Sequence, residues 1–353
     1  MEFKPDIKRL LATIRFEEPD RVPLADFGID KPVLERFMGR PMLTLEDEIS
    51  FRASAGFDFV YLRAEYEYAG TFFGAAMAGP EGTTHTEDSP AESISTMKDG
   101  PIATLHDFET YPWPDPHTVG VANHERATAA LPEGMGIITG VGGIFTRTWM
   151  LLGYDRFSLS LYDNPELVAR VAEQVGRTQC TVLRRLVKLP QVHAVCYGDD
   201  LGYTEALLAS PKVLRQYFLP WIEELSSIAH SAGMPFIMHS DGNLVEILDD
   251  LVAVGLNALH PIEPKAMDIY DLRRRYQHKL ALFGNIDLGY TLQAGRGRPQ
   301  DVRAEVREKI KALAPGGGYG LASGAGITHY VSLENFLALR DALLEYGHYP
   351  IRL

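Results

Sequence analysis

The sequence predicts a single α/β domain, residues 1–353, with the (β/α)8 TIM-barrel fold. Eight apolar runs of strand length recur along the chain, and most are followed by a polar or glycine-rich cluster and then a segment with helical periodicity. Several runs are almost continuously apolar, as expected for parallel strands that are covered on both sides. A doubly wound open sheet is the main alternative. The barrel is favoured because no GxGxxG turn follows an early strand.

The predicted strands alternate with segments that carry helix signals. Asn164-Pro165-Glu166 is typical of a helix start, with asparagine as N-cap and proline in the first turn, and Ser210-Pro211 repeats the pattern. Asn243 and Glu246 resemble a capping box. Arg303–Leu313 is an amphipathic helix that a proline and three glycines stop. The eight predicted strands are Val22–Asp26, Phe57–Leu62, Gly136–Val141, Val192–Gly198, Pro235–Ser240, Leu256–Ile262, Leu280–Asn285 and Tyr319–Ser323.

One segment, residues 68–116, departs from this alternation. It is rich in glycine, proline, threonine and acidic residues, and it ends in the aromatic sequence Tyr111–Pro116. A long segment without helical periodicity is usually an ordered lid or hairpin, or a disordered loop. Because of the aromatic content, we predict an ordered insertion over the active-site face of the barrel.

Composition and charge limit the partners. An apolar fraction of 46% in 353 residues can form a sizeable core. A net charge of -13 argues against nucleic acid or an anionic membrane as partner, and it disfavours a polyanionic substrate unless local arginines compensate. Cys180 and Cys196 lie in apolar segments and are expected to be buried free thiols. The charged start, Met1–Asp6, and the lack of a long apolar run predict a cytoplasmic protein.

Polar residues at the carboxyl ends of the predicted strands are the candidate site, because barrel enzymes hold their reactive groups there. His239 and Asp241 lie two residues apart, so both side chains point to the same side of the strand. Together with Glu263 they could hold zinc or another divalent metal and leave positions open for substrate. The alternative is that Asp241 caps the next helix and His239 is a hydrogen-bonded lining residue.

Two further acidic pairs follow predicted strands. Asp199 and Asp200 are adjacent and therefore point to opposite sides, so one of them is expected to face the pocket as a general base or a substrate-orienting group. An N-cap or a loop salt bridge explains them equally well. Asn285 and Asp287 repeat the two-residue spacing and are predicted to hold polar groups of the substrate, although helix capping also explains Asp287. Asp26 closes the first run and is a further candidate for substrate binding.

A glycine-rich cluster follows the third run. The spacing of Gly140–Gly143 resembles a backbone anion site but matches no specific phosphate motif. Arg147 and Trp149 come just after it and are predicted to line the pocket wall. No Ser-His-Asp elbow and no P-loop is present in the sequence.

Taken together, these motifs resemble the uroporphyrinogen decarboxylase superfamily, which also contains corrinoid-dependent methyltransferases. Members of this superfamily are (β/α)8 barrels, so the resemblance implies the same fold as the strand pattern. The segments that carry it cover most of the chain: Tyr111–Pro116, Arg147–Gly153, His239–Gly242, Pro261–Pro264, Gly284–Asp287 and Ala314–Tyr319.

The chain departs from both branches of the superfamily. The decarboxylases resemble one another in an Arg-Gln-Ala-Gly-Arg segment near the first strand, where this chain has Arg21–Phe27, and in a histidine near the last strand, where it has Ala325. An acidic pocket entrance in place of the two arginines would leave the carboxylates of a polycarboxylate substrate without partners, at a cost of several kcal/mol. The coenzyme M methyltransferases are similar to one another in a His-x-Cys pair and a later cysteine that bind zinc. Asp241 and Ala325 stand at those cysteine positions here.

The resemblance and these departures together predict a corrinoid-linked methyltransferase that removes methyl from a small O- or N-methylated substrate. A harder, oxygen-rich donor set suits an oxygen or nitrogen leaving atom better than a thiol. Catalytic roles are predicted for His239, Asp199 and Glu263. The predicted metal ligands are His239, Asp241 and Glu263, and the predicted substrate-binding residues are Asp26, Arg147, Trp149, Asp200, Asn285 and Asp287.

Two alternatives stay open. One is a decarboxylase of uroporphyrinogen or another carboxylated ring, in which Asp26, Asp199 or Asp200 holds NH groups. The other is a non-catalytic barrel that binds a tetrapyrrole or corrinoid. The expected cofactor is zinc or another divalent metal, and the expected methyl acceptor is a corrinoid on a separate protein. A homodimer is compatible with a barrel, but no sequence feature identifies an interface.

Overall fold

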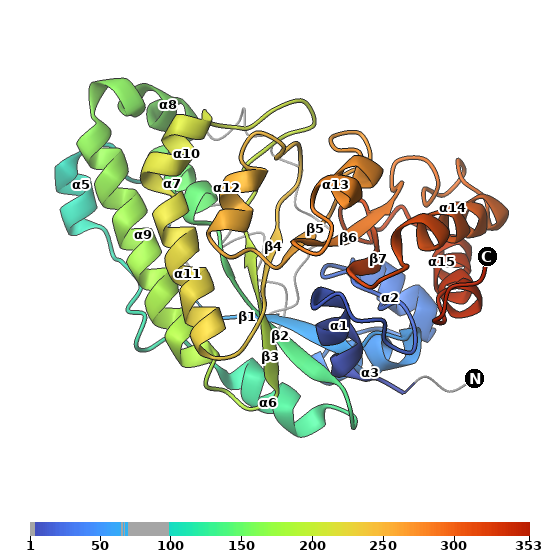
Figure 1. Cartoon of the computed structure of the whole chain (residues 1–353). Coiled ribbons are helices and arrows are strands. Elements are labelled where there is room, and N and C mark those ends of the chain that lie inside the picture. The colour runs from blue at the N-terminus through green and yellow to red at the C-terminus, as the bar shows by residue number, and fades with distance from the viewer. Residues whose placement is uncertain (1–3, 65, 67, 70–98) are drawn as a thin grey trace.

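A parallel sheet of seven strands, hydrogen-bonded to one another in sequence order, forms the centre of the computed structural model (Figure 1). The structure describes residues 4–64, 66, 68–69 and 99–353. The strands coincide with seven of the eight predicted runs, and the sheet curls as in a TIM barrel, so the predicted fold class is confirmed. The strands are β1 (Phe59–Arg63), β2 (Gly136–Gly142), β3 (Val192–Gly198), β4 (Phe236–His239), β5 (Ala258–His260), β6 (Ala281–Ile286) and β7 (Tyr319–Ser323).

The first predicted run, Val22–Asp26, lies beside β7 but forms only an isolated bridge. Ala25 N–H donates to the carbonyl of Leu321 at 2.8 Å, and Leu321 N–H donates to the carbonyl of Pro23 at 2.9 Å. The buried Arg52 side chain donates to the carbonyls of Asp26 and Phe27, so these acceptors have a guanidinium partner. The eighth barrel position is therefore filled by this run without a regular ladder.

Helices surround the sheet, and Figure 1 shows α9 beside α11 on one flank and α14 beside α15 on the other. The helices are α1 (Ile7–Ile14), α2 (Lys31–Met38), α3 (Leu45–Ala55), α5 (Leu105–Thr110), α6 (Ala122–Ala130), α7 (Ile144–Leu152), α8 (Tyr154–Asp163), α9 (Pro165–Leu186), α10 (Pro211–Tyr217), α11 (Leu219–Ser231), α12 (Leu248–Ala253), α13 (Ile269–Arg275), α14 (Pro299–Leu313) and α15 (Leu333–Tyr346).

Most of the predicted helix signals have their expected role. The side chains of Asn164 and Ser210 cap α9 and α10, each with proline in the first turn. The helix predicted at Arg303–Leu313 begins earlier, at Pro299. The capping box predicted at Asn243 is wrong, because the Asn243 side chain accepts from the amide of Val245 in a turn and α12 begins only at Leu248.

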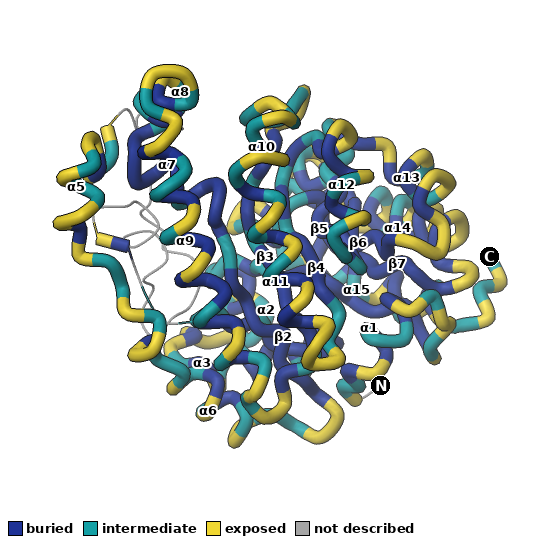
Figure 2. The backbone as a smooth tube through the Cα atoms, turned by 60° about the vertical axis from the view of Figure 1, so that its left-hand side comes forward, coloured by how far each residue is buried: buried dark blue, intermediate teal, exposed yellow. Residues whose placement is uncertain are grey.

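Most of the central strands are buried, as Figure 2 shows. Buried apolar side chains form one cluster inside the barrel and others beneath the helices. Side chains of this interior cluster are small, branched or aromatic, and include Ala194, Ala258, Ile237, Phe59 and Phe283. This mixture of sizes fills a barrel interior as a packed core. Cys180 and Cys196 are buried free thiols, as predicted.

Only part of the predicted insertion, residues 68–116, can be described. Tyr111 donates a hydrogen bond to the carbonyl of Ala69 at 2.7 Å, and its ring contacts Trp113 edge-on at 4.7 Å. The aromatic end of the segment is therefore packed. The predicted lid or hairpin itself falls largely on residues 70–98, which lie outside the described residues.

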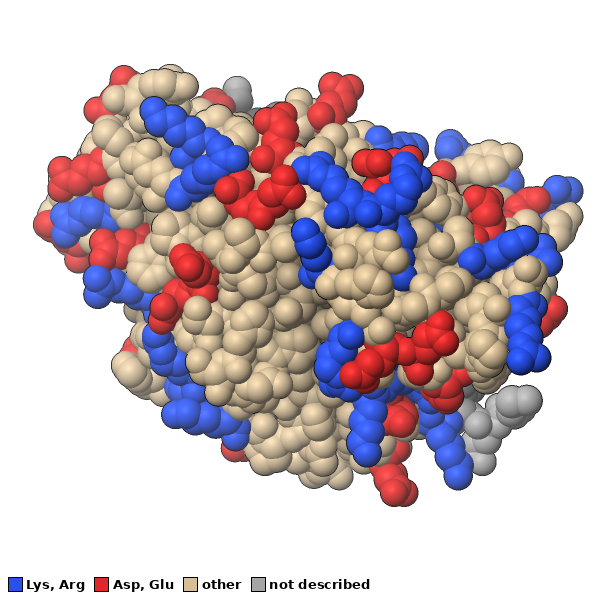
Figure 3. All heavy atoms as spheres, viewed as in Figure 1, with Lys and Arg blue, Asp and Glu red and all other residues tan. Residues whose placement is uncertain are grey.

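The surface carries charges of both signs. On the face shown in Figure 3, acidic and basic side chains are interspersed rather than gathered into a large patch of one sign. Within the described part of the chain, no helix combines the length and the apolar character needed to cross a bilayer.

Candidate active site

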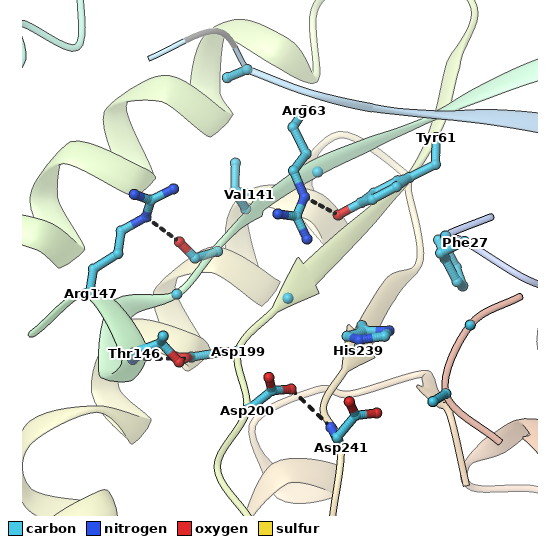
Figure 4. A pocket seen from close by; sticks show the side chains of 18 of the residues that line it. Phe27, Tyr61, Arg63, Val141, Thr146, Arg147, Asp199, Asp200, His239 and Asp241 are labelled. Atoms are coloured by element: carbon cyan, nitrogen blue, oxygen red, sulfur yellow. Dashed lines mark hydrogen bonds between the residues drawn. The ribbon is translucent and has the colours of Figure 1, made fainter. Parts of the chain in front are cut away.

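A cavity of about 310 Å³ lies at the carboxyl ends of β1 to β4, and the loops after the first run and after β7 also line it. This is the barrel face on which the sequence places the reactive groups. Its polar wall contains two arginines, a histidine and several aspartates (Figure 4). The aromatic side chains Phe27, Tyr61 and Tyr66 line it as well.

Three side chains with metal-ligand chemistry meet in this cavity. Asp200 follows β3, His239 ends β4, and Asp241 lies two residues beyond. One ligand atom from each lies within 4.8 Å of the other two. The register of the sheet explains the meeting, because Gly198 pairs with His239 and the amide of Asp241 donates to Asp200 Oδ1 at 3.0 Å.

Asp241 carries the least compensated charge of the three. Its Oδ1 is buried and has no hydrogen-bond partner among the described residues. Burial, and then the neighbouring carboxylates of Asp200 and Glu263, raise the pKa of Asp241 to about 7. A buried carboxylate with these surroundings is stabilised by a cation or by a proton. This orphaned oxygen and the donor set therefore fit a divalent metal ion.

His239 is held by a second histidine. Its Nδ1 lies 2.8 Å from Nδ1 of the fully buried His260, so one of the two nitrogens carries the shared proton. Burial lowers the pKa of both rings, which favours the neutral forms. When His239 donates this proton, its Nε2 keeps a lone pair for a metal. His260 therefore selects which nitrogen of His239 can act as a ligand.

Asp199 has a different role from Asp200. It is buried and accepts hydrogen bonds from the amides of Phe145 and Thr146, at 2.7 and 2.9 Å, and from the hydroxyls of Thr146 and Tyr197. These amides form the start of α7, so the carboxylate caps this helix and interacts with its dipole. Asp199 thus holds the cavity wall, and Asp200 is the member of the pair that joins the ligand cluster.

The same contact explains the glycine-rich cluster. The sequence predicts a backbone anion site at Gly140–Gly143, and the amides just beyond it do bind an anion, which is the chain's own Asp199. The carbonyl of Gly142 accepts from Arg147 Nε at 3.1 Å and from the Gln179 amide at 2.9 Å. An external phosphate at the amides of Phe145 and Thr146 would have to replace Asp199.

Two arginines lie in the cavity wall. Arg147 is predicted from the sequence, and its guanidinium lies over the rings of Tyr66 and Tyr68. Arg63 is a residue that sequence reasoning missed. It ends β1, and its Nε donates to the hydroxyl of Tyr61 at 3.1 Å. The signal was its position, one residue beyond the predicted run Phe57–Leu62.

Glu263 and Asp26 lie outside the cavity lining. Glu263 accepts a hydrogen bond from Thr204 at 3.3 Å and acts on the site through its charge near Asp241. The structure therefore groups Asp200, rather than Glu263, with His239 and Asp241. Asp26 is fully buried and accepts from the amide and the hydroxyl of Ser323, so it is tied to β7 instead of facing substrate.

Three other predicted substrate contacts also lie outside the lining. Trp149 is buried in α7 and packs against Tyr154 at 5.6 Å. Asn285 is buried in β6. Asp287 accepts from the amides of Gly289 and Tyr290 in a turn, well before α14 begins at Pro299, so it caps a turn and not a helix.

Comparison with protein-family models identifies the family of this chain. The family model described as uroporphyrinogen decarboxylase (URO-D) matches residues 53–346. The chain belongs to the uroporphyrinogen decarboxylase family. The predicted superfamily is thereby confirmed, and its known enzymes are decarboxylases and methyltransferases.

Individual relatives within the family are distant. Uroporphyrinogen decarboxylase of Pseudomonas fluorescens is 26% identical over 253 residues, which cover 69% of either chain. The enzyme of that name from Alkalilimnicola ehrlichii is 25% identical and covers 69% of this chain and 67% of its own. A solved structure named as a methyltransferase from Methanosarcina mazei aligns with 97% of this chain and 99% of its own, with a TM-score of 0.73 and 21% identity. This last similarity supports the fold.

Proposed function

We propose that the protein is a methyltransferase that takes a methyl group from a small O- or N-methylated substrate and passes it to a corrinoid on a separate protein. The observation that carries the proposal is the cluster of Asp200, His239 and Asp241 at the cavity, with its orphaned carboxylate oxygen. This set combines one imidazole with two carboxylates, and it suits a divalent metal that binds an oxygen or nitrogen leaving atom.

Two further observations support this branch of the family. The cavity volume of about 310 Å³ is at the lower end for ligand pockets, and it suits a small substrate better than a tetrapyrrole. A methyltransferase is also the named activity of the similar structure from Methanosarcina mazei.

Methyl transfer requires the site to stabilise the heteroatom from which the methyl group leaves. The bond between the methyl carbon and the heteroatom breaks, its electron pair stays on the heteroatom, and the methyl carbon forms a bond to cobalt(I). A divalent ion held by Asp200, His239 and Asp241 would supply Lewis-acid stabilisation for the charge that develops on the heteroatom. The shared proton between His239 and His260 keeps the His239 ring oriented. Asp199 fixes the start of α7 and with it the wall that carries Arg147.

The test is methyl transfer to a reduced corrinoid. Purified protein, supplied with zinc or another divalent metal, is incubated with cobalt(I) corrinoid and a broad panel of O- and N-methyl donors, and methyl-cobalt formation is followed by absorbance. We expect at least one donor to be used, and the Asp241→Asn variant to be inactive with it. The absence of transfer from the whole panel would argue against the proposal.

Decarboxylation is the second candidate, and two observations favour it. The curated relatives are named uroporphyrinogen decarboxylases. The cavity is lined by Arg63 and Arg147 as well as by four aspartates, so a carboxylate would find guanidinium groups there. Product analysis with uroporphyrinogen separates the candidates, because released carbon dioxide would identify the decarboxylase. Stoichiometric tetrapyrrole or corrinoid binding without turnover would instead identify a binding protein.

A further inference from the structure

We propose that Ser240 is a positioning residue that keeps Asp200 and Asp241 side by side, so that the metal cluster is formed before an ion binds. Ser240 lies between His239 and Asp241 in the chain. It is fully buried and does not belong to the cavity lining, so it acts through its neighbours and does not touch substrate. This role rests on the proposed function, because it adds a residue to the metal site of that function.

The Ser240 hydroxyl links the two loops that carry the carboxylates. Its Oγ accepts a hydrogen bond at 3.1 Å from the buried amide of Leu201, which follows Asp200. The same hydroxyl donates to the carbonyl of Asp241 at 3.4 Å. A hydroxyl has one proton and two lone pairs, so it can accept from the first loop and donate to the second. Alanine at this position would leave the Leu201 amide without its acceptor, and the link between the loops would be lost.

A second contact joins the two carboxylate-bearing residues directly. The amide of Asp241 donates to Asp200 Oδ1 at 3.0 Å, as the dashed line in Figure 4 marks. When both carboxylates are charged and no ion is bound, they repel each other, and this hydrogen bond opposes their separation. The Ser240 link opposes the same separation from the adjacent residues. It does so without occupying a carboxylate oxygen, so these oxygens stay available to a metal ion.

Gly242 permits the close packing of the two loops. Its φ of +84° is in the left-handed region, and a Cβ there would lie 2.4 Å from the carbonyl carbon of Gly202 and 2.5 Å from the amide nitrogen of Tyr203. Both the conformation and the close backbone approach require glycine. The amide of the next residue, Asn243, donates to the carbonyl of Tyr203 at 2.9 Å. The loops thus pack backbone against backbone, which keeps the Ser240 hydroxyl within reach of the loop after β3.

Preformed ligands bind a metal ion more tightly than mobile ones, because binding does not have to order them. Loss of the Ser240 hydroxyl should therefore weaken the metal site while the barrel stays folded. A serine with a purely structural role would instead lower the free energy of unfolding and leave the affinity for metal unchanged. The affinity for a metal ion is the quantity that separates these two roles.

The test is zinc affinity in the absence of substrate. Zinc is titrated into metal-free wild type, Ser240→Ala and Ser240→Thr against a competing chelator. We expect Ser240→Ala to bind zinc about 10- to 100-fold more weakly, as for the loss of an outer partner of a metal ligand. Ser240→Thr retains the hydroxyl and should recover most of the affinity. An unchanged affinity in Ser240→Ala would overturn the inference.

Ser226→Ala is the matched control. Ser226 is buried in α11, its hydroxyl donates to the carbonyl of Val254, and it does not line the cavity. The control therefore removes a buried hydrogen bond between a hydroxyl and the backbone outside the site. We expect it to keep the wild-type zinc affinity, whatever its effect on the free energy of unfolding. Equal weakening of zinc binding in Ser226→Ala and Ser240→Ala would show a general loss of packing and overturn the inference.

Methyl transfer at several zinc concentrations separates this role from the proposed function. With a donor that the wild type uses, we expect Ser240→Ala to need about 10- to 100-fold more zinc for half-maximal transfer and to approach the wild-type rate at saturating zinc. Weaker zinc binding in Ser240→Ala, with no transfer by the wild type from any donor, would support the role of Ser240 and reject the methyltransferase. Transfer with the same zinc requirement in both proteins would support the methyltransferase and reject the role of Ser240.

Discussion

Two buried carboxylates at opposite ends of the barrel differ in how their charge is compensated. Asp58 precedes β1 at the amino-terminal face and forms salt bridges with the buried Arg9 and Arg21. Asp241 follows β4 at the carboxyl-terminal face, and its neighbours Asp200 and Glu263 are themselves acidic. The fold supplies the partner for the first carboxylate. Within the described residues, the fold supplies no such partner for Asp241, whose charge is available for a bound cation. A structural buried charge is paired within the protein, whereas a functional one is left for a ligand.

The largest expected effect is on stability at the amino-terminal face. Asp58→Ala leaves the guanidinium groups of Arg9 and Arg21 buried without their shared carboxylate. We expect the free energy of unfolding to fall by about 3–5 kcal/mol, as for other broken buried ion pairs. Chemical denaturation measures it. A loss below about 1 kcal/mol would show that the Asp58 cluster is not a structural ion pair.

The corresponding substitution at the carboxyl-terminal face, Asp241→Asn, should reduce activity rather than stability. Asp241→Asn removes a buried charge that has only acidic neighbours, so the free energy of unfolding should be unchanged or higher at neutral pH. Methyl transfer should fall more than about 100-fold, since loss of even an outer partner of a metal ligand costs about 10- to 100-fold. Denaturation and the corrinoid assay on the same sample check both. A strongly destabilised Asp241→Asn variant that retains methyl transfer would contradict the difference proposed between Asp58 and Asp241.

A smaller effect is expected from the residue that orients His239. His260→Phe keeps an aromatic ring but removes the Nδ1 contact, so we expect the affinity for the metal to fall about 10- to 100-fold. Zinc titration with a competing chelator measures it. His230→Gln is the control, because His230 bonds Asn257 away from the cavity. In metal-free wild type, the imidazole proton between the two rings should be visible by NMR and absent from the variant.

The smallest effect is a pH dependence of stability. The folded pKa of Asp241, about 7, lies above its ordinary value of 3.8, so the folded state binds this proton more tightly. Its contribution is complete below pH 3.8 and is lost as the pH rises through 7, with a slope of at most about 1.4 kcal/mol per pH unit. Stability of metal-free protein should therefore fall more steeply between pH 4 and 7 in wild type than in Asp241→Asn. Equal slopes would mean that Asp241 titrates normally.

The fold was largely predictable because apolar runs and their spacing determine parallel strands. The exception, Val22–Asp26, forms an isolated bridge, and the next amide of β7, that of Ser323, donates to the Asp26 side chain instead of to a backbone carbonyl. Such a side-chain contact leaves no periodic signal. Alternation along a strand also predicted that His239 and Asp241 meet on one side. Both Asp199 and Asp200 line the cavity, contrary to the expectation that only one faces it, and only Asp200 belongs to the ligand cluster.

The composition of the site was less predictable, because it depends on how neighbouring strand ends meet. Asp200 joins His239 through the register between β3 and β4, whereas Glu263 follows β5 and turns toward Thr204. Arg63 and the carboxylate-capped start of α7 come from contacts between residues far apart in the chain. Local sequence patterns contain no signal for such contacts.

The metal content of the purified protein tests the central claim most directly. Elemental mass spectrometry, without added chelator, is applied to the wild type, to the His239→Ala, Asp241→Ala double variant and to His230→Ala as a control. We expect about one divalent ion per chain in the wild type and the control, and its loss in the double variant. No metal in the wild type, even after incubation with zinc, would contradict a metal-assisted site and would favour a metal-free decarboxylase or a binding protein.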